Sequence, residues 1–274
     1  MLLICPMKRL FLKLLLSVVF LNLSTLTGWT QENYFGVKEA SGAALIGMLY
    51  DFKQTQSREK TSVDVKKYAE IVDTFLSKNW DDAVLNSFYR VTQPLYLTEI
   101  YIPLISADEA PRAFGVGKIV APRMWMVHYK GQVSAPASGR YRFVGYADDW
   151  IAVAINQKTV LVGNRDDTRL PQINWKASEK DGMKAANGSL RYGDWIECTE
   201  GSLMDLDVAI GERPGGYFCA FLMIQKEGDV YTKNQQGNPI LPLFQLAAKP
   251  SIPPKDGAKG PPFVLSLKPW KAVP

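Results

Sequence analysis

The strongest constraint on the fold of this chain is a series of short segments between Leu95 and Gln225 in which apolar and polar residues alternate. Alternation with a period of two is typical of half-buried β-strands, because successive side chains point to opposite faces of a sheet. Clusters of Gly, Pro, Asn and Asp separate the segments, and no helical pattern lies between them. The sequence therefore predicts a mainly β protein, an antiparallel β-sandwich or barrel. The expected strands cover residues 95–102, 123–133, 139–145, 150–155, 159–162, 203–210 and 217–225.

A helical insertion is predicted near the N-terminus, within residues 61–88, after a strand at 43–52. Thr61, with Asp64 three residues later, resembles the capping box that begins many helices. A second short helical piece is expected within residues 81–88. Five large apolar residues then repeat on one face of the first helix: Tyr68, Ile71, Val72, Phe75 and Leu76.

The first 31 residues have the pattern of a secretory signal peptide. Lys8-Arg9 precede an apolar stretch at 10–26, and the small residues before Gln31 suit cleavage there. We therefore expect a secreted protein, or one held in the periplasm or cell envelope. An uncleaved membrane anchor is the alternative, but Lys13 interrupts the run of about 20 apolar residues that a spanning helix needs. No stable transmembrane segment is expected after processing.

Charge argues against nucleic acid as a partner. The 274-residue chain has a formal net charge of +5, and three of its positive charges, Lys8, Arg9 and Lys13, lie in the expected signal segment. Because no acidic residue precedes Glu32, removal of that segment leaves +2. So small a charge gives no electrostatic footprint for a nucleic acid.

Two cysteines remain when Cys5 is lost with the signal segment. Cys198 and Cys219 both lie in strand-like segments, and an oxidising compartment favours a disulfide between them. Such a bridge would stabilise the fold by about 3 kcal/mol. The alternative is two separately buried free thiols, and the sequence leaves both open.

No catalytic motif accompanies the predicted sheet. The chain has a single histidine, His128, which lies in an alternating strand and is interpreted as a structural residue. Glycosidases need two carboxyl groups about 5 to 9.5 Å apart, one on each side of the scissile bond, and no separated acidic pair stands out. The serine-hydrolase, zinc-protease and nucleotide-binding motifs are missing as well. We therefore predict a protein that is not an enzyme.

The most informative segment is 139–161. It contains a glycine, an aromatic strand, the adjacent acids Asp148 and Asp149, an apolar strand, the turn 156–158 and a further apolar strand. The strand and glycine at 125–131 precede it, and a Glu-x-x-Gly-Gly turn follows at 212–216. This order resembles the protective-antigen (PA14) domain family of bacterial toxins, glycosidases and fungal adhesins.

The resemblance covers about residues 43–226 and implies the domain organisation. It implies a secreted bacterial protein with a PA14-type β domain at 36–247 that carries the helical insertion at about 61–88. Residues 248–274 are rich in Pro and Lys and are predicted to form an extended tail or linker, with the segment 241–244 as a place where the chain could wrap around the domain.

The aspartate pair is the predicted metal site. In the adhesin branch of the family, two aspartates joined by a cis peptide hold Ca²⁺, and the metal contacts sugar hydroxyls. The resemblance therefore implies Asp148 and Asp149 as Ca²⁺ ligands. Their chemistry agrees, because two adjacent carboxylates repel each other and Ca²⁺ prefers oxygen ligands. The alternative is that the pair caps a loop through backbone N–H groups and holds no metal.

Residues near the pair are predicted to bind the ligand. Two departures from the family pattern accompany them: Trp150 follows the pair where a small residue is usual, and Gln157 replaces the glycine of the turn. The predicted ligand-binding residues are Trp150, Asn164, Asp166, Asp167 and Trp175.

Two functions of different classes follow from these observations. In the first, the protein is an exported, non-catalytic module that binds a glycan with the help of Ca²⁺. In the second, it is a structural or interaction protein of the cell envelope, which uses the β domain as a scaffold and binds an envelope protein.

Overall fold

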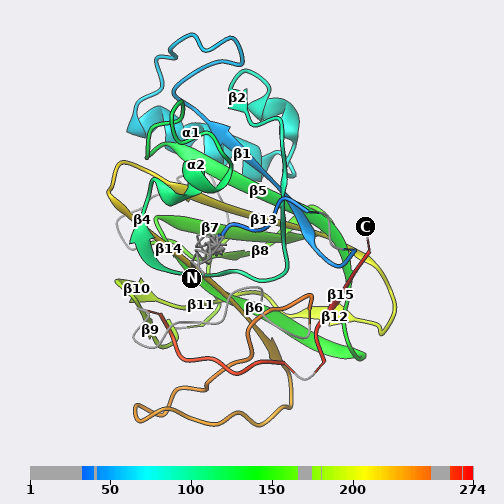
Figure 1. The fold of residues 1–274 in the computed structure, drawn as a ribbon. Coiled ribbons are helices and arrows are strands. Elements are labelled where there is room, and N and C mark those ends of the chain that lie inside the picture. The colour runs from blue at the N-terminus through cyan, green and yellow to red at the C-terminus, as the bar shows by residue number, and fades with distance from the viewer. Residues whose placement is uncertain are drawn as a thin grey trace, which may run out of the picture. The chain divides into compact units, whose positions relative to one another are not determined.

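Two antiparallel β-sheets pack against each other in the computed structural model of this protein (Figure 1). The structure describes residues 33–39, 42–165, 175–179, 181–247, 260–266 and 268–273. The predicted signal segment lies outside these residues. In the part of the chain that is described, no helix has both the length and the apolar character needed to cross a membrane.

The larger sheet has eight strands. Its main path is β2 (Tyr89–Arg90), β1 (Leu45–Asp51), β5 (Trp125–Ser134), β13 (Met204–Glu212), β7 (Trp150–Ile155) and β8 (Lys158–Val162), while β3 (Leu95–Leu97) pairs with β1 and β15 (Lys271–Val273) with β5.

The smaller sheet has five strands, and a two-stranded ribbon and three helical elements make up the rest of the regular structure in the described residues. The five strands are β11 (Arg191–Tyr192), β6 (Gly139–Asp148), β14 (Tyr217–Lys226) and β4 (Tyr101–Ser106), with β12 (Ile196–Cys198) paired to β6. The other elements are β9 (Lys184–Ala185), β10 (Gly188–Ser189), α1 (Val65–Ser77), α2 (Glu109–Ala113) and the 3₁₀ helix η1 (Asp82–Leu85).

The main core lies between the two sheets. It receives alternate residues of each strand, for example Val127 and Tyr129 from β5, Ile151 and Val153 from β7, and Phe143 from β6. This arrangement follows from the period-two pattern, because every second side chain of a strand points to the same face. The predicted antiparallel sandwich is thereby confirmed.

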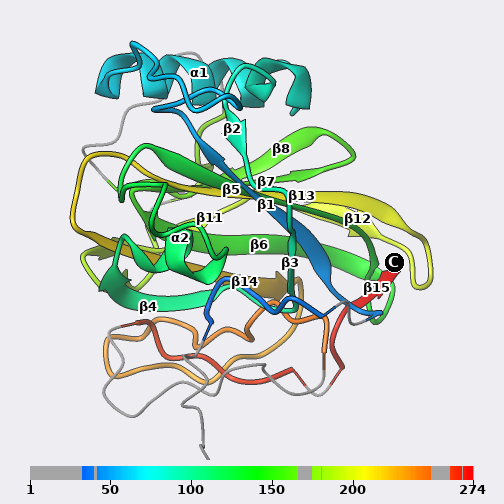
Figure 2. The same ribbon diagram turned by 45° about the horizontal axis from the view of Figure 1, so that its top comes forward.

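A second core lies on the opposite face of the larger sheet. Figure 2 shows α1 lying over this face. Tyr68 and Phe75 of the helix pack there against Ala152, Ala154 and Ala209 of the sheet. Because these alanines have small side chains, the helix can approach the strands closely. Strand β7 is therefore buried on both faces, which explains why its sequence is a continuous apolar run.

The predicted helical insertion is confirmed, but its start differs from the prediction. The N-cap of α1 is Asp64, whose Oδ1 accepts a hydrogen bond from the Lys67 backbone N–H at 2.7 Å. Thr61 instead donates its hydroxyl to the Phe52 carbonyl oxygen. Asp64 lies three residues closer to the helix than Thr61, and its carboxylate accepts directly from a free backbone N–H group of the first turn. Thr61 therefore does not form the predicted capping box.

The described part of the predicted tail returns to the domain. Strand β15 pairs with the end of β5, and Trp270 just before it is 2% exposed within the main core. Leu243 and Phe244 are also buried. The domain therefore does not end at residue 247, because a large aromatic side chain from the last few residues fills part of its core.

This packing predicts the effect of removing the Trp270 side chain. Trp270→Ala should lower the free energy of unfolding by about 3–5 kcal/mol, the usual cost of truncating a buried tryptophan. Denaturant unfolding measures the change, with Lys271→Ala, the exposed next residue and the first of β15, as the control. Equal midpoints for the two variants would contradict the docking of this segment.

Candidate functional site

The aspartate pair lies where the chain passes from one sheet to the other. Asp148 is the last residue of β6 in the smaller sheet, and Asp149 leads directly into β7 of the larger sheet. The peptide bond between the two aspartates is cis. Both residues are buried, with exposed fractions of 3% and 8%. Two carboxyl groups are thus held side by side with little access to water.

Hydrogen bonds orient both carboxylates. Asn187, in the turn between β9 and β10, donates its Nδ2 to Asp148 Oδ2 at 2.5 Å, and Arg165 Nη1 lies 3.2 Å from Asp148 Oδ1. The Arg213 backbone N–H donates to Asp149 Oδ2 at 2.6 Å. The pair is therefore fixed by three segments that are distant in the sequence.

A third carboxyl group lies near the pair. Glu212 ends β13, and its neighbour Gly211 is opposite Trp150 of β7. The Glu212 side chain is fully buried, and neither of its oxygens has a hydrogen-bond partner among the described residues. Burial and the nearby Asp149 and Asp148 carboxylates raise the pKa of Glu212 to about 9. Glu212 is therefore protonated at neutral pH.

The pKa of Asp149 is raised for the same reason. Burial, opposed by the Arg213 N–H and reinforced by the charge of Asp148, raises the pKa of Asp149 to about 6. Acidic groups at this end of the sandwich thus outweigh the positive charge that faces them. A bound cation would lower both pKa values and stabilise the ionised pair.

The oxygen atoms present suit Ca²⁺ chemically. Beside the two carboxylates, Asn164 Oδ1 is buried and has no hydrogen-bond partner within the described residues. Carboxylate and amide oxygens are the ligands that Ca²⁺ prefers. Across the described ranges, however, no three His, Cys, Asp or Glu side chains converge as a metal-binding group. A Ca²⁺ ion would therefore be held by the aspartate pair, with amide or carbonyl oxygens completing the site.

The predicted ligand-binding residues have different positions. Asn164 forms a bridge with Ala147, so it lies beside the pair. Asp166 and Asp167 lie outside the described residues. Trp175 is half-buried against the main core, and its Nε1 donates to Asp194 Oδ2 at 3.1 Å. The Asp194 backbone N–H donates to the Val160 carbonyl oxygen within β8. Trp175 is therefore linked through Asp194 to that strand, and no hydrogen bond joins it to the pair within the described residues.

The prediction that Trp150 contacts the ligand is wrong. Its side chain is fully buried under α1, where Nε1 donates to the Tyr68 hydroxyl at 2.9 Å. The residue that follows the pair points to the outer face of the larger sheet, and the helix covers that face. Trp150 is therefore a core residue.

Sequence reasoning missed three residues at this site: Arg165, Asn187 and Glu212. Arg165 directly follows Asn164, and Glu212 begins the closing Glu-x-x-Gly-Gly turn, so both lay in segments that had been noticed without being assigned a role. No sequence pattern pointed to Asn187, because only the folding of the β9–β10 ribbon brings it to Asp148.

The structure contradicts the disulfide and supports two free thiols. Cys198 is opposite Gly139 at the start of β6, while Cys219 is opposite Asp148 at its end. Nine residue steps along a strand span about 30 Å, far beyond the reach of a disulfide. Both thiols are buried and free, and burial raises the pKa of Cys198 to about 11 and that of Cys219 to about 12.

No protein-family model matches the chain, and no curated protein matches it. Solved structures with some similarity include the PA14 sugar-binding domain of an RTX adhesin, at 16% identity and a TM-score of 0.40, over 70% of this chain and 94% of that one. The PA14 domain of the MpAFP antifreeze protein has 13% identity and a TM-score of 0.40, over 69% and 85%. The A domain of epithelial adhesin 6 from Candida glabrata, solved with Galβ1-3GlcNAc, has 12% identity and a TM-score of 0.41, over 74% and 95%.

The free thiols predict a pattern of alkylation. Iodoacetamide should leave Cys198 and Cys219 unmodified in the folded protein, because both are buried and protonated. In denaturant without a reductant, both should react. Peptide mass mapping reads the result, and a requirement for reductant in denaturant would show that the thiols are bridged.

The buried acid predicts a pH dependence of stability. The folded state holds the Glu212 proton more tightly than the unfolded chain, so the free energy of unfolding should fall as pH rises from about 4.5 to about 9. Glu212→Gln cannot ionise and should flatten this dependence. Denaturant unfolding in EDTA between pH 5 and 9 measures it.

The matched control for this series is Glu200→Gln, which changes an exposed glutamate. It should follow the parent protein at every pH. If Glu212→Gln also follows the parent, the proton does not reside on Glu212 in the folded state.

Proposed function

We propose that this protein is an exported, non-catalytic module that binds carbohydrate at the Asp148–Asp149 end of the sandwich with the help of Ca²⁺. The observation that carries the proposal is the group of buried oxygen atoms there, in which the two carboxylates adjoin the unpartnered Asn164 Oδ1. A buried polar atom without a partner is costly, so Asn164 Oδ1 beside the hydrogen-bonded carboxylates favours an external ligand.

Asp148 and Asp149 would hold the ion, with Asn164 as a further oxygen donor. When bound, Ca²⁺ supplies positive charge to the acidic group and coordination positions for sugar hydroxyls, since it takes six to eight oxygen ligands. The chain's own residues prepare the site. Asn187 and Arg165 orient Asp148, and the Arg213 N–H orients Asp149.

Preorganisation supports a binding role for this end of the molecule. The carboxylates are already held by hydrogen bonds from three separate segments, so little conformational entropy is lost when a ligand arrives. Neutral Glu212 adds a carboxyl group without adding a third negative charge, which limits repulsion within the group.

The N-terminal segment supports export. Residues 1–31 carry the basic and apolar pattern of a secretory signal. An exported domain meets millimolar Ca²⁺ and surface glycans, which are the two ligands that the site chemistry suits. A non-catalytic role is consistent with the single histidine, which is buried within the larger sheet.

Thermal unfolding tests the calcium part of the proposal. Ca²⁺ at about one hundred times its Kd should raise the Tm by about 5–10 °C relative to EDTA, because a ligand of the native state stabilises by mass action. Asp148→Asn should abolish this rise. Asp229→Asn, an exposed aspartate in another loop, should retain it.

A glycan array with the same three proteins tests the carbohydrate part. The parent and Asp229→Asn should bind a set of glycans in Ca²⁺, and EDTA or Asp148→Asn should abolish the binding. A calcium-dependent Tm without any glycan binding would favour the role of an envelope interaction protein. An unchanged Tm in all three proteins would exclude the calcium site.

A further inference from the structure

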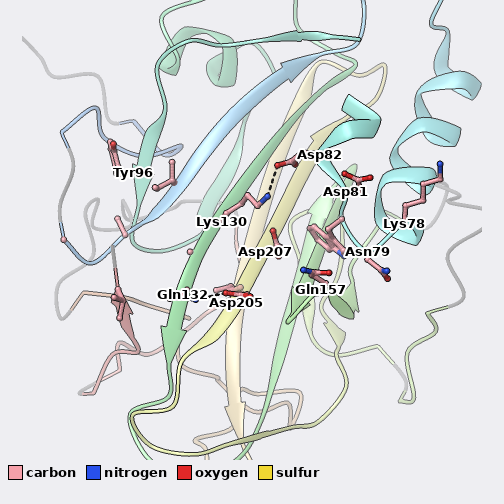
Figure 3. Close-up of a pocket in the computed structure, with 17 residues that line it drawn as sticks. Lys78, Asn79, Asp81, Asp82, Tyr96, Lys130, Gln132, Gln157, Asp205 and Asp207 are labelled. Atoms are coloured by element: carbon pink, nitrogen blue, oxygen red, sulfur yellow. Dashed lines mark hydrogen bonds and ion pairs between the residues drawn. The ribbon is translucent and has the colours of Figure 1, made fainter. Parts of the chain in front are cut away.

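A groove of about 1050 Å³ lies on the outer face of the larger sheet, in the part that α1 does not cover (Figure 3). Its volume is slightly above the range of about 300–1,000 Å³ typical of ligand pockets. The groove therefore has room for a ligand of several linked units.

The groove is separate from the aspartate pair. Strand β7 begins next to Asp149 and ends before Gln157, which lines the groove. The strand places about 20 Å between the two sites. A ligand in the groove therefore does not contact the carboxylates of the pair.

One side of the groove is polar, with free hydrogen-bonding groups. Lys78 and Asn79 follow the end of α1, and Gln157 lies in the turn between β7 and β8. All three are exposed, and their side chains have no hydrogen-bond partner among the described residues. These groups can donate to a ligand without breaking a bond within the protein.

His128 of β5 fixes the polar side of the groove to the larger sheet. Its Nδ1 lies 3.1 Å from Asp82 Oδ1 and its Nε2 lies 2.8 Å from Asp207 Oδ1, while Lys130 Nζ lies 2.8 Å from Asp82 Oδ2. His128 is 2% exposed, and its ring packs against Trp80. The loop that forms the wall is therefore anchored to β5 and β13, and the groove is preformed.

The opposite side of the groove is apolar. Ile46 of β1 and Val273 of β15 are 45% and 40% exposed, and the half-buried Tyr96 lies on this side, away from Lys78 in Figure 3. The C-terminal strand thus supplies part of this wall. A ligand with one apolar face and one polar edge fits such a groove.

The charges in the groove disfavour acidic ligands. Acidic side chains outnumber basic ones, so the local potential is negative. Although burial opposes it, hydrogen bonds from His128 and Lys130 hold the pKa of Asp82 well below its usual range. The groove contains four aspartates and two lysines: Asp81, Asp82, Asp205, Asp207, Lys78 and Lys130.

We propose that this groove is a second binding site, which takes a neutral oligosaccharide of several sugar units. Sugar rings have apolar C–H faces, which suit Ile46 and Tyr96, and hydroxyl edges, which suit Asn79, Gln157 and Asp205 Oδ2. The other oxygen of Asp205, Oδ1, already accepts from the Gln132 side chain. The choice of a saccharide rests on the proposed function, whereas the groove does not depend on the aspartate pair. Two separate sites on one domain would increase avidity for extended glycans.

Residue-resolved NMR of the ¹⁵N-labelled protein tests this site. The probes are maltohexaose, cellohexaose and N-acetylchitohexaose, with hexagalacturonate as the acidic comparison. At least one neutral hexasaccharide should shift the side-chain amide signals of Asn79, Gln132 and Gln157, and hexagalacturonate should not. The amide signals of Asn164 and Asn187 report separately on the aspartate pair.

Two variants distinguish binding in the groove from a remote effect. A side chain added at Gly42, which lines the groove, meets open space, so Gly42→Trp should fill the groove and abolish the shifts. Lys78→Ala should weaken binding about 5- to 10-fold through the loss of one charged donor. Lys66→Ala, which changes an exposed lysine in the first turn of α1, should bind like the parent.

The outcomes separate this proposal from the proposed function. Shifts at Asn164 and Asn187 alone would overturn the second site and leave the first intact, and shifts in the groove alone would do the reverse. Shifts that persist in Gly42→Trp would overturn the second site. So would groove shifts with hexalysine and with none of the neutral saccharides, which would assign the groove to a cationic peptide.

Discussion

The hydroxyl group of Tyr68 joins the helical insertion to the larger sheet, and both candidate sites depend on that join. It donates to the Trp125 carbonyl oxygen and accepts from Trp150 Nε1, each at 2.9 Å. The contact needs a glycine at 211, because a Cβ there would lie 2.5 Å from both the Trp150 ring and the Tyr68 hydroxyl. Since all these groups are buried, loss of one would leave an unsatisfied partner in the core.

The hydrogen bond to Tyr68 holds Trp150, the first residue of β7, directly after the aspartate pair. The pair therefore lies where the chain changes sheets, with its carboxylates beside the end of β13 and the loop that follows β8. Burial then shapes the chemistry, because it raises the pKa values of Asp149 and Glu212 and leaves oxygen atoms that water does not reach. A cation bound there would lower these pKa values and stabilise the ionised carboxyl groups.

The same helix creates the groove by covering only part of the sheet. Where α1 ends, residues 79 and 80 have positive φ angles and turn the chain back toward the strands. His128 then ties this loop to the sheet through Asp82 and Asp207. His128 is therefore a structural residue, as the sequence suggested, and it also makes one side of the groove rigid.

The sequence alone determined the sandwich and the helical insertion, because local periodicity depends only on which side chains face a core. It also located the aspartate pair, because two adjacent acidic residues between two predicted strands can be recognised in the sequence. Only the tertiary structure decided that Trp150 is core, that Cys198 and Cys219 are far apart, and that Trp270 returns to the domain. The roles of Asn187 and Glu212, and the existence of the groove, could also be found only from the fold. Each depends on contacts between segments that are far apart in the sequence, and the sequence does not say how close such segments lie in space.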